Sequence, residues 1–91
     1  MALSGQTTVA AAGTEVVLGT QQVNAAVMVK ALSTNTGIMY VGNDSGAVSS
    51  SSGMPLAAGD SIVFDLVSNL ANILVDSSVN GEKVAWLILE A

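Results

Sequence analysis

The hydrophobic pattern along the chain alternates over short stretches, and Gly, Asn, Asp or Ser interrupts it about every 8–12 residues. Alternation with a period of two is typical of strands that cover a core with one face. Turn residues at this spacing are typical of an all-β sandwich or barrel. The pattern therefore predicts a compact antiparallel β-sandwich or jelly-roll-like barrel of seven or eight short strands. Those it places most clearly are 6–11, 15–18, 23–33, 38–42, 61–66, 70–75 and 83–89.

Two of these segments show the alternation best. In 23–33 the odd-numbered apolar residues from Val23 to Ala31 share one face, and the even-numbered residues share the other. In 61–66 the same period predicts that Val63 and Asp65 lie outside. The residues predicted to lie inside in this second segment are Ile62, Phe64 and Leu66.

The last predicted strand, 83–89, is apolar on both faces. A free edge strand of this kind would aggregate. Two arrangements avoid this problem: a central place in a sheet with both faces covered, or burial of one face by another subunit. The pattern does not decide between them. The residues of this strand that are candidates for an interface are Val84, Trp86, Leu87 and Leu89.

The remaining segments contain residues typical of turns. The serine-rich stretch 43–53 is predicted to be an exposed, mobile loop. Pro55 and Gly59 predict a tight corner before the strand at 61–66, with Asp60 capping it. Asn80 and Gly81 form a pair that is typical of tight hairpins. The first eight residues are small and uncharged, and we expect that they can extend as an N-terminal arm.

The length of 91 residues predicts a single domain, 1–91, without room for a second core. Hydrophobic residues make up 51% of the chain but aromatic residues only 3%, so the core must consist of aliphatic side chains and methionine. Such a small core places the domain near the lower end of the usual ~5–15 kcal/mol of stability. Further burial between subunits would add to this, and we therefore expect a homo-oligomer, a dimer or a trimer.

Charge and residue inventory exclude several functions. The net charge is −5, with two lysines and no arginine, so the chain lacks the cationic surface that nucleic-acid binding requires. The seven carboxylates are dispersed, which indicates a solvated, mildly anionic surface. Without histidine, cysteine or arginine, few catalytic arrangements remain, and we expect no enzyme activity, no cofactor and no metal. No stretch approaches the ~20 apolar residues of a membrane span, so we expect no membrane association.

A ligand-binding loop is the remaining chemical possibility. Tyr40 and Trp86 could stack on a sugar ring, although a core or interface position is the favoured interpretation for Trp86. Asn43 and Asp44 carry oxygen atoms on a predicted loop next to Tyr40. These atoms could serve a ligand, but the favoured interpretation is a turn whose side chains bond to the local backbone.

Four sequence segments together resemble small virion proteins of tailed bacteriophages, of the capsid decoration or cement type. The resemblance covers roughly residues 35–86. The segments are Asn35-Thr36-Gly37 followed by Ile38-Met39-Tyr40-Val41-Gly42, then Gly53-Met54-Pro55-Leu56-Ala57-Ala58-Gly59-Asp60-Ser61-Ile62, and finally Asn69-Leu70-Ala71-Asn72-Ile73-Leu74-Val75-Asp76.

The resemblance implies a compact β-sandwich without catalytic residues. It also implies a role on the outer surface of the capsid, where such a protein binds the head lattice and holds neighbouring major capsid subunits together after assembly in the host cytoplasm. The expected partners are then the major capsid protein and further copies of the chain. The alternative is a module on the head or tail that binds a host glycan or receptor through Tyr40 and the loop 43–53.

Overall fold

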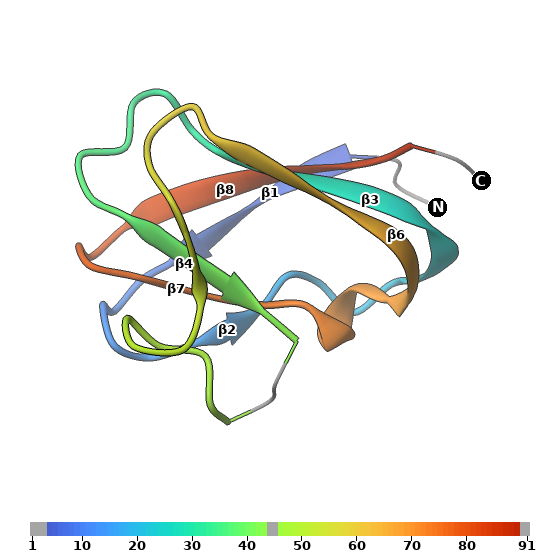
Figure 1. Ribbon diagram of the computed structural model, residues 1–91, viewed down its shortest axis with the longest axis horizontal. Helices are drawn as coiled ribbons and strands as arrows, with labels where there is room; N and C mark the ends of the chain where they lie inside the picture. The colour runs from blue at the N-terminus through green and yellow to red at the C-terminus, as the bar shows by residue number, and fades with distance from the viewer. Residues whose placement is uncertain (1–3, 44–45, 90–91) are drawn as a thin grey trace.

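Two antiparallel four-stranded sheets pack face to face in the computed structural model, which describes residues 4–43 and 46–89 (Figure 1). Sheet A has the strand order β1-β8-β3-β6, and sheet B has the order β2-β7-β4-β5. The predicted all-β sandwich is therefore confirmed, with eight strands. Their bounds are β1 Ser4–Val9, β2 Val16–Val17, β3 Gln22–Ala31, β4 Met39–Gly42, β5 Met54–Leu56, β6 Ser61–Asn69, β7 Leu74–Ser77 and β8 Glu82–Ile88.

The strand order is that of a jelly roll. Strands pair as β1 with β8, β2 with β7, β3 with β6 and β4 with β5, and successive pairs alternate between the two sheets. All these pairs are antiparallel, as they are when a long two-stranded ribbon is wrapped into two layers. The first half of the chain thus supplies one strand of nearly every pair, and the second half supplies the other.

The core lies between the sheets and is made of aliphatic side chains and methionine, as the composition predicts. The alternation along β3 is confirmed, because its odd-numbered residues are buried and its even-numbered residues are exposed or half-buried. Sheet B contributes Met39, Val41 and Val75 from its two central strands, β4 and β7. Phe64 of β6 and Trp86 of β8 pack against this core and are only partly buried.

The predicted alternation along β6 is wrong at Leu66, which is 76% exposed, while Val67 is buried. The reason is a β-bulge. Val27 pairs with Phe64 and Ala25 pairs with Val67, so two residues of β6 lie opposite one residue of β3. The extra residue shifts the period by one, and Asp65 and Leu66 both lie outside the core.

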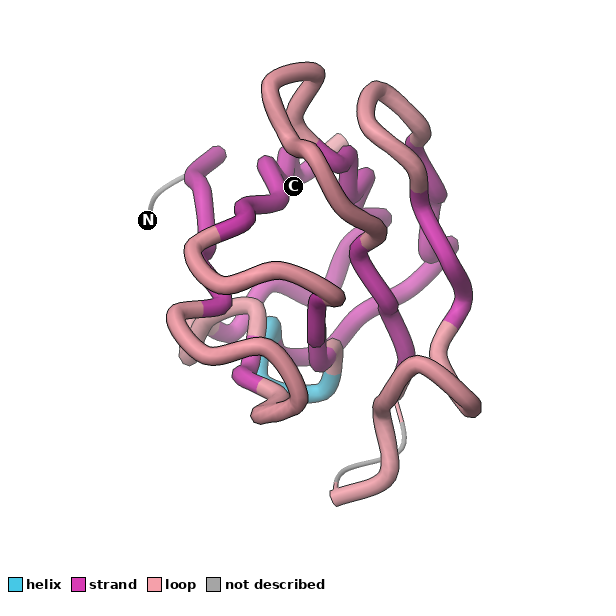
Figure 2. Tube along the Cα trace, turned by 90° about the vertical axis from the view of Figure 1, so that its left-hand side faces the viewer, coloured by secondary structure: helices cyan, strands magenta, loops and turns pink. Residues whose placement is uncertain are grey.

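One strand prediction and one turn prediction need correction. The segment 70–75 is not one strand, because Leu70–Asn72 forms a single helical turn, η1, drawn in cyan in Figure 2. Asn69 caps this turn by accepting a hydrogen bond from the Ala71 backbone N–H. Asn80 and Gly81 do form a turn, with φ of +80° at Gly81, but it joins β7 of sheet B to β8 of sheet A. It is a crossing between sheets and not a hairpin.

The predictions for the first eight residues and for Pro55 are also changed. Residues 4–8 do not form a free arm, because they belong to β1 and pair with β8. The rest of that predicted arm, residues 1–3, lies outside the described residues. Pro55 lies within the short edge strand β5, and the corner follows at 57–60, where the Asp60 carboxylate accepts a hydrogen bond from the Ala57 N–H.

Three further acidic side chains hold loops in place and are not part of a solvated surface, contrary to the sequence-based expectation. Glu82 is buried, and its Oε1 accepts hydrogen bonds from the Thr36 and Gly37 N–H groups at 2.6 and 2.5 Å. Asp76 and Glu15 each accept two backbone hydrogen bonds in the same way. The loops are thus fixed by the chain's own carboxylates.

Candidate interaction surface

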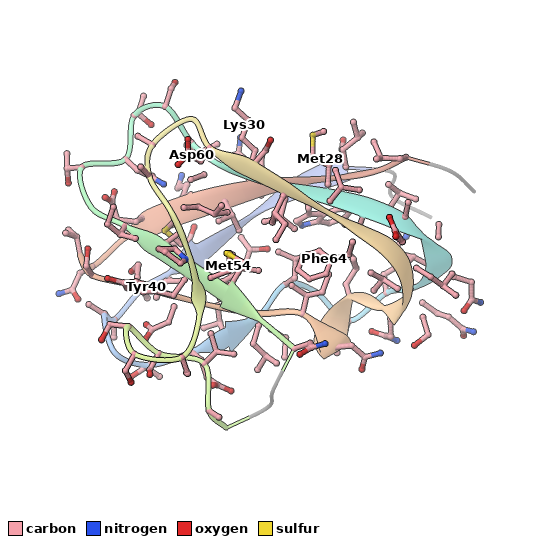
Figure 3. All side chains as sticks on the ribbon, in the orientation of Figure 1. Met28, Lys30, Tyr40, Met54, Asp60 and Phe64 are labelled. Atoms are coloured by element: carbon pink, nitrogen blue, oxygen red, sulfur yellow. The ribbon has the colours of Figure 1, made fainter. Side chains whose placement is uncertain are left out.

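The outer face of sheet A, which points away from sheet B, is the face on which exposed large apolar side chains gather. Because β8 is central in this sheet, its outward side chains lie between those of β1 and β3. Met28 and Lys30 of β3 project from this face, whereas Phe64 points between the sheets (Figure 3). Hydrogen bonding in register arranges the outward residues in rows across the strands.

Three rows define the chemistry of this face. The central row is Leu87, Met28 and Val63 from β8, β3 and β6. One row towards the β3 C-terminus lie Ala85, Lys30 and Ser61. The row on the other side contains Ala26 with the bulge residues Asp65 and Leu66, and Leu89 lies beside it because its N–H donates to the Ala26 carbonyl.

Four of the seven large hydrophobic side chains that are exposed in the described residues gather on this face. Leu66 is 76% exposed, and Val63, Leu87 and Leu89 are each more than 40% exposed. Together with the half-buried Met28 they form what we call the apolar patch. Exposed apolar groups that gather on one face of a sheet, bordered by charged residues, are typical of a protein contact.

The charges on this face are separated along the strands. Lys30 and Lys83, the chain's only basic side chains, both project from it at one end. Asp65 lies at the other end, four residues along β6 from Ser61, the partner of Lys30. Four residues of a strand span about 13 Å, so Lys30 and Asp65 are too far apart for an ion pair within one copy.

A shallow hollow of about 440 Å³ lies over Ala85, between β1 and β3. It forms because Ala85 is small and its neighbours on both strands are longer. Its rim includes Gln6, Met28, Lys30 and Leu87. The face is therefore not flat. It has a hollow in the row of Ala85, Lys30 and Ser61, which we call the lysine row, and bulky leucines at the opposite end.

The four interface candidates of the predicted strand 83–89, of which Leu89 directly follows β8, divide between the two faces. Val84 is fully buried in the core, and Trp86 points the same way and packs against Gly5, where an added Cβ would lie 2.6 Å from the indole. Leu87 and Leu89 lie on the outer face. The arrangement in which both faces of β8 are covered within the chain is wrong, whereas its central position in a sheet is confirmed.

The candidate ligand-loop residues do not form one site. Tyr40 is half-buried in β4 of sheet B, next to Pro55 of β5. Asn43 is exposed and lines a different, smaller hollow with Phe64 and Asn72. Asp44 lies outside the described residues. The predicted pairing of Tyr40 with Asn43 around a ligand is therefore not seen in the described part of the chain.

Part of the apolar patch does not follow from the sequence pattern. The period of two separates Met28 from the buried face of β3 and predicts Val63 outside, but it does not by itself mark either residue as part of an interface. Their apolar character at such positions is the signal that the sequence offers. No sequence signal marks Leu66 as an outward residue, because the bulge that turns it outward depends on pairing with β3.

Other kinds of site find no support in residues 4–43 and 46–89. These residues bring together no group of three acidic side chains that could hold a metal ion. The same ranges contain no helix long and apolar enough to cross a membrane. No family model matches the chain, and no curated protein or solved structure matches it either.

Proposed function

We propose that the chain is a virion structural protein, a capsid decoration protein that binds the outside of the head lattice and stabilises contacts between major capsid subunits. The observation that carries the proposal is the apolar patch on sheet A, because burying apolar area is the main source of free energy in association. The jelly roll itself is common in viral capsid domains, which is an argument from fold alone.

The rest of the molecule suits a role that needs no catalysis. Its loops are held by internal hydrogen bonds to Glu15, Asp76 and Glu82, so the domain presents fixed surfaces. A lattice offers the same contact many times, and an oligomer that engages several sites gains affinity without any stronger single contact. A modest patch per copy is therefore sufficient.

The proposal is tested with heads that lack this protein, prepared from the virus that encodes it. Purified chain should bind the heads to saturation and raise their unfolding temperature in calorimetry. A Leu66→Asp variant should bind more weakly, because a charge in the apolar patch weakens the association between copies on which multivalent binding depends. Met54→Asp, at an exposed apolar site on sheet B, should bind like wild type. Heads that show neither binding nor added thermal stability would contradict the proposal.

A host-glycan-binding module is the second candidate, supported by one observation. The hollow of about 210 Å³ beside β6 has Asn43, Asn72, Ser68, Phe64 and the patch residue Leu66 among its lining residues, and the Asn72 amide donates a hydrogen bond to the Ser68 hydroxyl. Amides next to an aromatic ring are suited to sugar hydroxyls and ring faces. A glycan array should then give binding that Asn43→Ala abolishes, and an array without any binding would remove this candidate.

A further inference from the structure

We infer that the outer face of sheet A is the interface between two copies of this chain, which pack with their sheets face to face and their strands antiparallel. The inference deepens the proposed function and rests on it for its biological role, since it names a second copy as the partner that covers the apolar patch, and this dimer is then the oligomer that engages several sites of the lattice. Three features of the face, namely charge, shape and area, point to a second copy in this orientation.

The charges are complementary only when one copy is reversed. A twofold axis across the strands, through the central row of Leu87, Met28 and Val63, places the lysine row of one copy over the row of Asp65 in its partner. Lys30 then lies opposite Ala26 of the partner subunit, and Asp65 of the partner subunit is one strand away, about 4.8 Å to the side. The symmetry forms this pair twice.

The other face-to-face orientation has the opposite effect. A twofold axis along the strands would place each row over the same row of the partner, so that the lysine row lies over the lysine row and the row of Asp65 lies over the row of Asp65. Like charges held opposite each other disfavour a contact. Because the chain contains only two basic side chains and both border this face, charge favours the antiparallel arrangement over the other one.

The shape of the face fits the same orientation. Leu89 directly follows β8, two rows from Ala85. The axis through Leu87 therefore brings the Leu89 side chain of one copy over the hollow above Ala85 in the other. An exposed leucine thus fills a hollow that the chain leaves empty, and it does so on both sides of the axis.

The area indicates a reversible dimer. Four strands about 4.8 Å apart, each about seven residues long, present on the order of 400 Å². A contact of this size buries roughly 1,000 Å² or less in total, which is at the weak end of specific interfaces. We therefore expect a dimer that forms with rising concentration, and that gains affinity where copies are gathered on a repeating surface.

The test is sedimentation equilibrium of the purified full chain and its variants, with circular dichroism to confirm that each is folded. Wild type should show a monomer–dimer equilibrium. Leu87→Asp places two carboxylates at the axis and should weaken the dimer by more than about tenfold. Met54→Asp, which adds the same charge on sheet B, should leave the equilibrium unchanged. A wild-type chain that stays monomeric, or forms trimers, would overturn the inference.

A charge exchange tests the orientation itself. Lys30→Glu and Asp65→Lys should each weaken the dimer about tenfold, because each variant turns both cross-interface pairs into like charges. An equimolar mixture of the two variants should dimerise like wild type. In the mixed dimer the introduced glutamate of one copy faces the introduced lysine of the other, and the second pair is the native Lys30 with the native Asp65. A mixture that associates no better than either variant alone would overturn the antiparallel geometry.

The outcomes also separate this inference from the proposed function. If the variants follow the expected pattern but the protein does not bind heads, the dimer is real and the decoration role is wrong. If Leu87→Asp abolishes binding to heads while wild type is monomeric at all concentrations, the face contacts the lattice, and the inferred dimer is wrong.

Discussion

Glu82 shows how single residues determine the loops of this protein. Its buried carboxylate holds the turn before β4 by accepting hydrogen bonds from two successive backbone N–H groups, at Thr36 and Gly37. A hydrogen bond to a charged acceptor contributes more than a neutral one, and donors that lose their acceptor away from water are costly. The turn is therefore predicted to be sensitive to this one side chain.

Replacing Glu82 with alanine should lower the free energy of unfolding by about 2–3 kcal/mol, because both N–H groups lose their acceptor. Glu82→Gln keeps an acceptor oxygen and should cost about 1 kcal/mol. Urea denaturation measures both. Asp65→Asn, at an exposed carboxylate, is the matched control when the protein is dilute enough to be monomeric, and it should then change stability by less than about 0.5 kcal/mol. Equal stability of all three variants would contradict the role of Glu82.

Trp86 and Gly5 form a pair across β8 and β1 in which each residue explains the other. The indole occupies the space that a side chain at position 5 would need. Trp86→Ala should lower the free energy of unfolding by about 3 kcal/mol, near the low end of values for tryptophan because the ring is only partly buried. It should not change the sedimentation behaviour of the folded fraction, since the ring points away from the outer face.

Gly5→Val should also destabilise the protein, because its side chain would force the indole out of place. The fluorescence of Trp86, the chain's only tryptophan, reports this directly. A red-shifted emission with lower stability is expected. Unchanged fluorescence and stability would show that the indole does not lie against Gly5. Thr8→Val, at an exposed position of the same strand, is a suitable control.

The bulge in β6 is the element that converts a simple amphipathic strand into part of an interface. Without it Leu66 would face the core, as the sequence pattern predicts, and Val67 would then face the solvent. With it, Asp65 and Leu66 both project from sheet A, where they supply a charge and the most exposed leucine of the patch. One inserted residue thus provides two of the features on which the antiparallel dimer depends.

Substitutions on each side of the bulge test it. Leu66→Ser should change the free energy of unfolding by less than about 0.5 kcal/mol, because the side chain is already in solvent. Val67→Ala should cost about 1.5–3 kcal/mol, because it removes buried methyl groups. The two variants are compared by chemical denaturation. A larger loss for Leu66→Ser than for Val67→Ala would mean that the strand has no bulge.

Local patterns predict strands in this protein better than they predict connections. The period of two along β3 is readable because its positions from Val27 to Lys30 keep their neighbours in register on both sides. The bulge, the helical turn η1 and the crossing at Asn80–Gly81 depend on which distant strand lies alongside, and no short window of sequence contains that information. The order of strands in each sheet likewise depends on distant parts of the chain and cannot be predicted from a short window of sequence.

At the scale of the whole molecule, the fold buries most large apolar residues in a core and gathers four of the seven that are exposed in the described residues on one outer face. The apolar character of both sides of β8 predicts Leu87 as an interface residue, and Leu87 lies on the outer face. The sequence predicts Val84 as an interface residue just as it predicts Leu87, because alternation along a strand that is apolar on both faces does not show which face is the inner one. The sequence pattern does not predict the charge separation between Lys30 and Asp65 either, since it arises only when β3 and β6 pair.

We propose that this chain works by packing into a larger assembly, and the mass of its native complex is the decisive measurement. The protein carrying a small affinity tag is purified from cells in which it is naturally produced, and the complex is sized by sedimentation and its proteins identified by mass spectrometry. We predict particles far heavier than a dimer, with a major shell protein as the main partner. Recovery of the chain alone, as a monomer or dimer in solution, would contradict the account.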